Sequence, residues 1–286
     1  MQRILILEQL REPERSLFHG IGLDLGILVH SADPAEFHLQ GSAPSLDGRA
    51  VPAEFDALVV RSYRRFATVR QIARAFHTAG RPVLGLDPLH LSFTQDKLCD
   101  LMDLQDAGVP VPKTWSRAED TPTNVVVSKE NWGYGGAGVQ LVDMRAPEER
   151  EKPSVEWVNH HFQEFLDADE DWRVLVCEGK ALPWVIVRRP APNDFRTNTH
   201  QGGEVEVVPA HLFPDAEALA SIAVGAAEAL GRPCAGVDLR RGAQGTPVVL
   251  EVNRTPRLRL GAHTEQVVRA YLSAWSEALP QERQSH

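Results

Sequence analysis

The first 92 residues alternate short apolar runs with a segment of helical periodicity. The apolar runs have the length of β-strands, at residues 4–7, 27–29, 57–60 and 83–85. Between the last two, apolar residues recur every three or four positions, at Phe66, Val69, Ile72, Ala73 and Phe76. Gly80 and Pro82 then end the predicted helix. Strands that alternate with helices predict a small parallel sheet covered by helices, and no G-x-G-x-x-G follows the first strand to suggest dinucleotide binding.

The pattern changes after about residue 92, so we expect a second domain over residues 93–286. A short helix is predicted after Thr94 as its N-cap, with apolar positions at Leu98, Leu101 and Met102. Strands are predicted at residues 124–129, 139–142, 163–166, 172–176 and 182–188, and helices over 215–230 and near the C-terminus. Core packing explains the stripe of the last helix (Val268, Leu272, Trp275, Leu279) most simply, and a membrane or partner surface is the alternative.

A predicted hairpin from Gly236 to Asn253 carries polar residues where the apolar pattern calls for none. Asp238 interrupts its first strand, and Glu251 and Asn253 end the second. Because side chains alternate along a strand, Val249, Glu251 and Asn253 are expected on one face. Glu251 and Asn253, joined by Asp238 of the partner strand, would form a set of three oxygen ligands that suits Mg²⁺. A hairpin with one solvated face explains the same residues, and the hairpin alone does not decide between the two.

A glycine-rich loop follows the strand that ends at Lys129. Gly133, Gly135, Gly136 and Gly138 would let backbone N–H groups approach a phosphate, and the loop is expected to fold down over it. Lys129 would neutralise the phosphate charge. The loop is not a Walker A motif, because its lysine precedes the glycines. A plain tight hairpin is the alternative interpretation.

A second group of cations lies between residues 187 and 203. Arg188, Arg189 and Arg196 occur there with Asn198, and guanidinium groups bind carboxylate or phosphate in a bidentate manner. Arginines in a solvated loop are the alternative. The histidines show no metal-ligand spacing and are interpreted as ordinary surface or supporting residues: His160, His161, His200 and His263.

Composition narrows the class of protein. The chain has 286 residues, of which 43% are hydrophobic, enough for one large core or two modest ones. No apolar run approaches the ~20 residues of a membrane span, and the first run is too short for a signal peptide. Three scattered cysteines indicate reduced thiols and the cytoplasm. A net charge of −9 without a basic stripe argues against nucleic acid as a partner.

Taken in order, these motifs resemble the ATP-grasp superfamily, and most closely its RimK-like branch of amino-acid ligases. The resemblance covers about residues 90–275 and rests on QDKLCDL around Lys97, Lys129 before the glycine loop, QEFL, DWR, FRTNTHQGG and GVDL…LEVNRTP. The FRTN…GG element favours this branch over the D-Ala–D-Ala ligases. The resemblance implies an α/β (α+β) ATP-grasp fold preceded by a small Rossmann-like pre-ATP-grasp domain, residues 1–92. The ATP-grasp domain would divide into a central lid subdomain (93–162) and a C-terminal subdomain (163–286).

The resemblance also implies a role for each matching residue. ATP would be bound by Lys97, Lys129, the loop glycines, Glu164, Phe165 and Leu166 at the adenine, and Asp171. Two Mg²⁺ ions, replaceable by Mn²⁺, would be held by Asp238, Glu251 and Asn253, with Glu251 between them. The phosphate and acceptor side would be formed by the catalytic group Arg173, Arg196 and Asn198. The substrate would be bound by Arg188, Arg189 and Arg257.

The reaction implied is an ADP-forming carbon–nitrogen ligation. ATP activates a carboxylate as an acyl phosphate, and an amine then displaces phosphate to form an amide. The expected partners are an amino acid and an amine or carboxylate acceptor, such as a peptide or protein tail, and the enzyme is expected to be a cytoplasmic homo-oligomer. An ATP-grasp kinase or phosphotransferase and a non-catalytic nucleotide-binding module are the alternatives. Because all three expected metal ligands are present, a non-catalytic module is the weaker of these.

Two departures from the family pattern bear on the substrate rather than on ATP. Glu130 follows Lys129 where the family usually has proline, and RTPRLR follows Asn253 where small residues and Pro-Gly-Leu are common. Arg257 would therefore lie near the place where acid and amine meet. It would either bind an anionic substrate or neutralise the nearby carboxylates.

Overall fold

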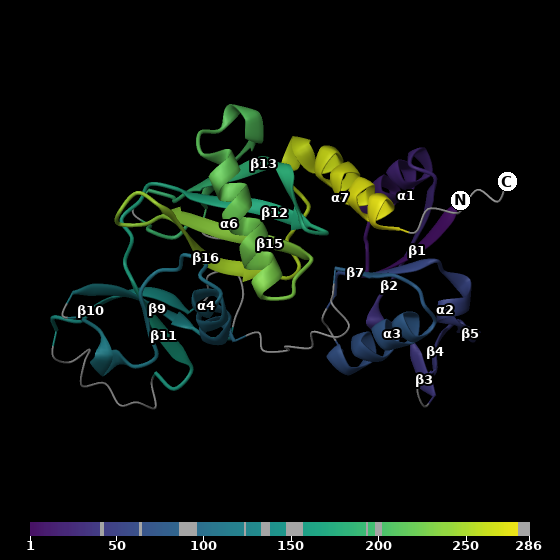
Figure 1. The fold of residues 1–286 in the computed structure, drawn as a ribbon, viewed down its shortest axis with the longest axis horizontal. Coiled ribbons are helices and arrows are strands. Elements are labelled where there is room, and N and C mark those ends of the chain that lie inside the picture. The colour runs from purple at the N-terminus through teal and green to yellow at the C-terminus, as the bar shows by residue number, and fades with distance from the viewer. Residues whose placement is uncertain are drawn as a thin grey trace.

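The computed structural model describes residues 1–40, 43–62, 65–85, 96–122, 124–132, 138–146, 157–192, 194–197 and 202–279. Within these ranges the chain forms four sheets, ordered β2-β1-β6-β7, β3-β4-β5, β10-β9-β11-β8 and β14-β13-β12-β15-β16. The five-stranded sheet lies in the middle of the molecule, with β1–β7 at one end and β9–β11 at the other (Figure 1).

The N-terminal sheet is parallel and buried on both faces. Its strands are β1 (Gln2–Leu7), β2 (Ile27–Ala32), β6 (Ala57–Val60) and β7 (Val83–Leu84). Ile4 and Ile6 pack toward one face and Leu5 and Leu7 toward the other, which is why residues 4–7 of β1 are all apolar. The helices are α1 (Glu14–Asp24), α2 (Val51–Glu54) and α3 (Phe66–Thr78). The predicted strands and α3 are confirmed.

Some elements of this region have no counterpart in the prediction. They are α1 and a small antiparallel sheet of β3 (His38–Gln40), β4 (Ala43–Leu46) and β5 (Arg49–Ala50). Only Phe18, Ile21 and Gly22 of α1 are buried, so its apolar stripe is narrow. The three strands have two to four residues each, too short to show a period of two.

The second sheet is antiparallel and carries the glycine-rich connection between two of its strands. It contains β8 (Thr114–Trp115), β9 (Val125–Glu130), β10 (Val139–Asp143) and β11 (His160–Glu164). The antiparallel pairing of β10 with β9 confirms the strands predicted at residues 124–129 and 139–142. Of the loop glycines, Gly138 is described, and its φ of 71° requires a glycine. Gly133, Gly135 and Gly136 lie outside the described residues.

The helix before this sheet, α4 (Lys97–Asp106), corrects two expectations. Its N-cap is Asp96, whose carboxylate accepts from the N–H groups of Leu98 and Cys99, whereas Thr94 lies outside the described residues. Met102 is 53% exposed, since the buried positions of this helix are Leu101 and Leu104.

The five-stranded antiparallel sheet connects the two ends of the molecule. Its strands are β12 (Asp171–Cys177), β13 (Lys180–Arg189), β14 (Glu204–Pro209), β15 (Cys234–Arg241) and β16 (Pro247–Asn253). Helix α6 (Ala216–Ala229) covers one face, where Val174 and Val176 of β12 point. Helix α7 (Thr264–Ala278) covers part of the other, against Leu175 and Cys177. Except for β14, these elements confirm the predicted strands and helices.

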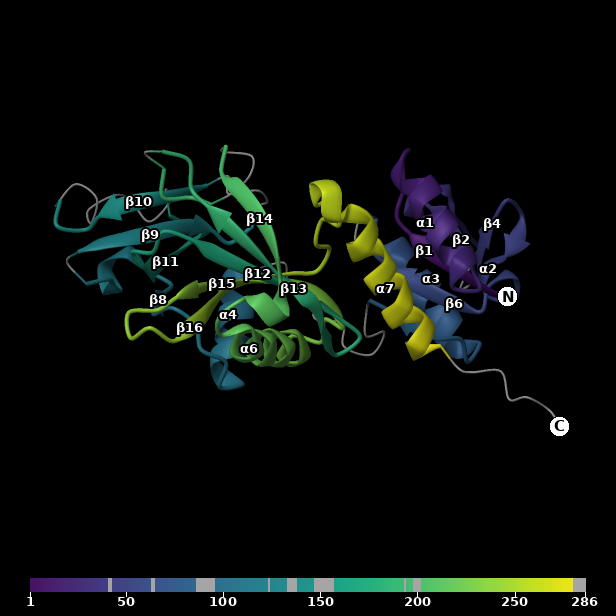
Figure 2. The same ribbon diagram turned by 90° about the horizontal axis from the view of Figure 1, so that it is seen from above.

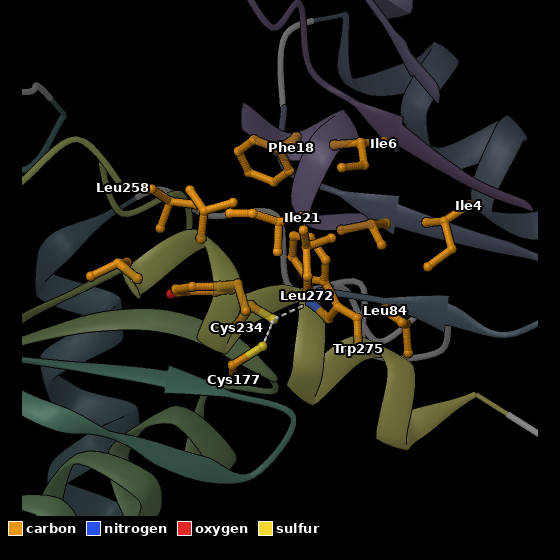
Figure 3. Close-up of a cluster of buried hydrophobic side chains, with 14 of the residues drawn as sticks. Ile4, Ile6, Phe18, Ile21, Leu84, Cys177, Cys234, Leu258, Leu272 and Trp275 are labelled. Atoms are coloured by element: carbon orange, nitrogen blue, oxygen red, sulfur yellow. Dashed lines mark hydrogen bonds between the residues drawn. The ribbon is translucent and has the colours of Figure 1, made fainter. Parts of the chain in front are cut away.

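Helix α7 lies between the N-terminal sheet and the five-stranded sheet (Figure 2). Its residues Tyr271, Leu272 and Trp275 are fully buried in one cluster with residues of both sheets, including Ile4 and Cys234 (Figure 3). The apolar stripe of the last helix is therefore core packing, as the simpler interpretation held. In the described part of the chain, no helix combines the length and apolar character that crossing a membrane requires.

Two of the three cysteines meet in this cluster. Cys177 and Cys234 face each other across β12 and β15 with their Sγ atoms 3.3 Å apart, and both are free thiols. Trp275 Nε1 donates to Cys234 Sγ at 3.5 Å (Figure 3). Burial is the main cause that raises the pKa of the Cys177 thiol. The prediction of reduced cysteines is consistent with this pair.

Candidate functional site

A cavity of about 880 Å³ is lined by residues of β9–β11, of one face of the five-stranded sheet, and of segment 255–263 after β16. Residues from Lys97 to His263, which lie far apart in the sequence, thus line one cavity. The predicted residues that line it are Lys97, Lys129, Glu164, Leu166, Asp171, Arg173, Arg188, Arg196, Asp238, Glu251, Asn253 and Arg257. Phe165, Arg189 and Gly138 do not line it, and Asn198 lies outside the described residues.

A β-bulge places the carboxylates of the hairpin in this cavity. Asp238 pairs with Glu251, but the next pair is Leu239 with Val249, which leaves Leu250 as an extra residue. Val249 consequently packs toward α6, while Leu250, Glu251 and Asn253 line the cavity. The expectation that Val249 shares a face with Glu251 is wrong, because the bulge breaks the strict alternation.

Asp238 is a buried carboxylate held by three side chains. Arg173 donates to it through Nε at 2.6 Å and a terminal nitrogen at 2.8 Å, and Arg188 lies 3.1 Å from it. Asn253 Nδ2 donates to the second oxygen at 3.3 Å. Burial alone would raise the pKa of Asp238, but the two guanidinium groups outweigh it and lower the pKa. The carboxylate is therefore ionised near neutral pH.

Glu251 of β16 is paired directly with Asp238 of β15, so two carboxylates are neighbours across the two strands. Within the described ranges, its carboxylate forms one ion pair, a long one, with 3.8 Å between Oε1 and Lys97 Nζ. Like charges in directly opposite strand positions repel each other, and a cation between them offsets that cost. Two carboxylates with the amide oxygen of Asn253 form a donor set that fits a hard divalent cation.

Lys129 and His161 are directly opposite each other on β9 and β11, and both line the cavity. Burial lowers the pKa of Lys129 to about 8, with Lys97 adding to the shift and Glu251 opposing it. His161 is fully buried, and burial followed by the charges of Lys129 and Lys97 lowers its pKa to about 3, so the ring is neutral. His161 is therefore not a surface residue, because it is fully buried, and like Gln163 two positions later on β11 it lines the cavity.

Two residues of the site were missed by the sequence analysis. Arg240 is buried, pairs with Asp171, and donates to the backbone oxygen of Leu166 at 3.1 Å. Thr197 donates its hydroxyl to the other oxygen of Asp171. The signal for Arg240 was its position two residues after Asp238, which places both on one face of β15. No local pattern pointed to Thr197.

The predicted arginine cluster is divided in the structure. Arg188 faces the cavity, whereas Arg189, its neighbour in β13, pairs with Glu206 at 2.9 Å and Glu170 at 3.2 Å. Adjacent residues of a strand point to opposite faces, so both cannot face one ligand. Arg196 lines the cavity and is held by the carboxylate of Asp194.

The N-terminal sheet reaches the segment after β16 through Arg61. This guanidinium is 6% exposed, donates to Glu8 at 2.7 Å, and donates to the backbone oxygen of Pro256 at 3.2 Å. On the other side, the ring of Pro256 lies against Gly236, where a Cβ atom would come within 2.8 Å of it. The segment that carries Arg257 is thereby fixed between two sheets.

Comparison with known proteins shows which family has this arrangement. Residues 121–270 match the family model described as "RimK-like ATP-grasp domain". This chain belongs to the RimK-like ATP-grasp family. It is 30% identical over 268 residues, 85% of each protein, to "Probable alpha-L-glutamate ligase 2" of Shewanella baltica.

Solved structures show the same fold at lower identity. The RimK-like chain is similar to the ATP-grasp ligase PsnB complexed with a minimal precursor, with a TM-score of 0.71, 20% identity, and coverage of 98% of this chain and 99% of that one. It is also similar to the D-cycloserine synthetase DcsG, with a TM-score of 0.64, 19% identity, and coverage of 97% and 99%. The predicted ATP-grasp fold is confirmed.

The family also confirms the class of enzyme. The RimK-like protein is an ATP-dependent carboxylate–amine ligase, as the motifs predicted, and ATP-grasp ligases use ATP and Mg²⁺. PsnB has been solved with Mg and ADP. The cavity fits these two groups: Asp238, Glu251 and Asn253 supply oxygen donors, and Lys97 and Lys129 supply positive charge beside them.

Proposed function

We propose that this ligase forms an amide between two substrates. One is a peptide or protein tail, which supplies the carboxylate, and the other is an acidic amino acid of the glutamate type, which supplies the amine. The observation that carries the proposal is the convergence of three oxygen donors, two lysines and Arg257 on one cavity. The named relative is a glutamate ligase, and PsnB was solved with a precursor, which supports an amino acid and a peptide as the substrate classes.

Each residue has a task that follows from its position. The adenine would lie at Glu164, Phe165 and Leu166 near the end of β11. Phe165 does not line the cavity, and its ring packs edge-on against Phe195 with centroids 6.3 Å apart, so it would shape this pocket from behind. Asp171, whose two oxygens are taken by Arg240 and Thr197, would act through Arg240, which binds the carbonyl of Leu166.

The phosphates would lie between Lys97, Lys129 and the metal ligands. Asp238, Glu251 and Asn253 would hold two Mg²⁺ ions, or Mn²⁺, with Glu251 between them. When bound, these ions neutralise charge on the phosphoryl group during its transfer to the carboxylate.

Arg173 keeps Asp238 ionised and, with Arg196 and Asn198, would stabilise the developing charge. The loop glycines would cover the phosphates. Arg188 and Arg257 would bind the acidic substrate, whereas Arg189 is paired with Glu170 and Glu206 away from the cavity.

ADP release tests the proposal. The enzyme is incubated with ATP, Mg²⁺ and each amino acid, with candidate peptides or hydroxylamine added as the second substrate. A ligase releases ADP only when both a carboxylate and an amine are present. ADP release with one hydroxyl-bearing substrate and no amine would identify a phosphotransferase. Binding of ATP without any turnover would identify a non-catalytic module.

Nucleotide affinity should fall as the pH rises through 8. The pKa of Lys129 lies near 8, so its ammonium is present below that pH and lost above it. The dissociation constant of Mg-ADP, measured by calorimetry from pH 6.5 to 9.5, should therefore increase by up to about tenfold for each unit above pH 8. The control is Lys129→Arg, which stays charged and should give a nearly flat profile. A flat profile in the unmodified enzyme would contradict a phosphate contact by Lys129.

Removal of the Arg257 side chain should weaken binding of the acidic substrate selectively. Loss of a bidentate carboxylate contact costs about 2 kcal/mol, so Arg257→Ala should raise the KM for that substrate about thirtyfold and leave the KM for ATP unchanged. Arg269→Ala, which removes an exposed arginine of α7, is the control. An equal effect on both KM values would instead assign Arg257 to the neutralisation of the metal carboxylates.

The broader organisation also remains a proposal. We expect a Rossmann-like pre-ATP-grasp domain over residues 1–92, followed by the subdomains 93–162 and 163–286. The parallel sheet β2-β1-β6-β7 and the separate sheets β8–β11 and β12–β16 support this division. Residues 86–95, where the first boundary falls, lie outside the described residues. We further expect a cytoplasmic homo-oligomer that binds neither nucleic acid nor membranes, which light scattering of the purified enzyme would test for its oligomeric state.

A further inference from the structure

Arg232 forms a buried ion pair behind the wall of the cavity. Its side chain is 5% exposed, and one terminal nitrogen donates to Oδ1 of Asp100 in α4 at 2.6 Å. The other terminal nitrogen donates to the backbone oxygen of Val252 in β16. Neither Arg232 nor Asp100 lines the cavity. A single guanidinium group thus connects a helix to a strand from outside the site.

Both points of attachment adjoin residues of the site. Asp100 follows Lys97 by three residues, so the two are neighbours on the first turn of α4. Val252 lies between Glu251 and Asn253, both of which line the cavity. Helix α4 lies beside β16 in both views of the molecule (Figures 1 and 2). At the cavity the helix and the strand meet again, where Lys97 Nζ is 3.8 Å from Glu251 Oε1.

The arginine extends from a fixed point of the backbone. It lies between α6 and β15, and its backbone N–H donates to the oxygen of Ala227 near the end of α6 at 2.8 Å. Burial raises the pKa of Asp100 even with the arginine beside it, so removing this carboxylate from water costs energy. A buried ion pair is often no more stabilising than apolar side chains of similar volume. What the pair holds in place explains it better than a gain in stability.

We propose that Arg232 is a positioning residue that sets the spacing between Lys97 and Glu251, acting through Asp100 on the helix and through the carbonyl of Val252 on the strand. The proposal rests on the roles proposed above for Lys97 at the phosphates and Glu251 at the metal. A movement of α4 relative to β16 would separate two groups that bind the same nucleotide. Misplacement of a reacting group by about 1 Å can cost about a hundredfold in rate.

Two substitutions separate the two attachments. Arg232→Gln removes both, so it should raise the KM for ATP and the Mg²⁺ concentration for half-maximal ADP release, each about tenfold, the usual effect of losing a hydrogen bond to a charged group. Asp100→Asn leaves Arg232 bonded to Val252, so it should raise the KM for ATP about fivefold and keep the Mg²⁺ requirement within about twofold. The KM for the acidic amino acid should change by less than about twofold in both variants.

Val69→Ala is the control for a general loss of stability, because Val69 is fully buried in α3 against the N-terminal sheet. It should lower the urea midpoint and leave the Mg²⁺ requirement unchanged. An unchanged Mg²⁺ requirement in Arg232→Gln, an equal rise of all three constants, or the same rise in Val69→Ala would overturn the proposal. ADP release by the unmodified enzyme that needs no Mg²⁺ would contradict the proposed function instead.

A comparison in a second background covers the case in which Arg232→Gln does not fold. If Asp100 acts through Lys97, its effect should largely disappear once the ammonium group is gone. Asp100→Asn should therefore raise the KM for ATP by less than about twofold when Lys97→Met is already present, against about fivefold in its absence. An undiminished fivefold effect would show that Asp100 acts on the site by another route and would overturn the proposal.

Discussion

Replacing Glu251 with glutamine should abolish ADP formation, lowering kcat on the order of 10³-fold while the fold is retained. The substitution keeps the shape of the side chain and removes the charge that faces Asp238 across the hairpin. Glu251 is half-buried at the cavity wall, and its long contact with Lys97 leaves its oxygens available to a cation. A carboxamide offers one ligand oxygen instead of two and carries no charge, so Mg²⁺ would be held more weakly and the γ-phosphate would no longer be neutralised as it is transferred.

Single-turnover ADP release and circular dichroism measure activity and fold in the same preparation. Glu277→Gln, which changes an exposed carboxylate of α7 paired with Lys180, should retain full activity. Asp238→Asn should also be severe, but it disturbs Arg173 and Arg188 as well, so Glu251 is the cleaner test. Near-normal turnover in Glu251→Gln would remove Glu251 from the metal site.

Replacing Trp275 with alanine should destabilise the protein by about 3–5 kcal/mol, the usual effect of deleting a fully buried aromatic side chain. Trp275 is fully buried in α7 and packs in one cluster with the N-terminal sheet and the five-stranded sheet (Figure 3). The cavity left behind would lie where the two sheets meet, and the contact with Cys234 would be lost as well.

Urea unfolding followed by circular dichroism gives this change as a lower midpoint. Trp132→Ala is the matched control, since Trp132 is 53% exposed and its removal should change the free energy of unfolding by less than about 0.5 kcal/mol. Trp275→Phe, which keeps an aromatic ring, should lie between the two. Equal midpoints for Trp275→Ala and Trp132→Ala would mean that α7 does not hold the two sheets together.

Long periodic segments were predicted well because the spacing of their own apolar residues shows which positions are buried. Residues 4–7 of β1 are buried on both faces and form an unbroken apolar run, and α3 buries Val69, Ile72, Ala73 and Phe76 at the spacing that the sequence shows. β14 was missed because its first three residues are exposed, so its pattern resembles that of a loop. The cap of α4 was misplaced because several residues before Lys97 are able to cap a helix, and only the backbone geometry selects Asp96.

The sequence by itself determined the order of the motifs, the family, and the chemical types present: two lysines, three oxygen donors and a set of arginines. Those features are local or follow from order along the chain. The tertiary structure decided which of them meet. The bulge at Leu250 set which face carries Glu251, strand pairing put His161 beside Lys129, and β13 turned Arg188 and Arg189 apart. These outcomes depend on neighbouring strands from distant parts of the chain, and a contact between distant residues leaves no period in the sequence of either one.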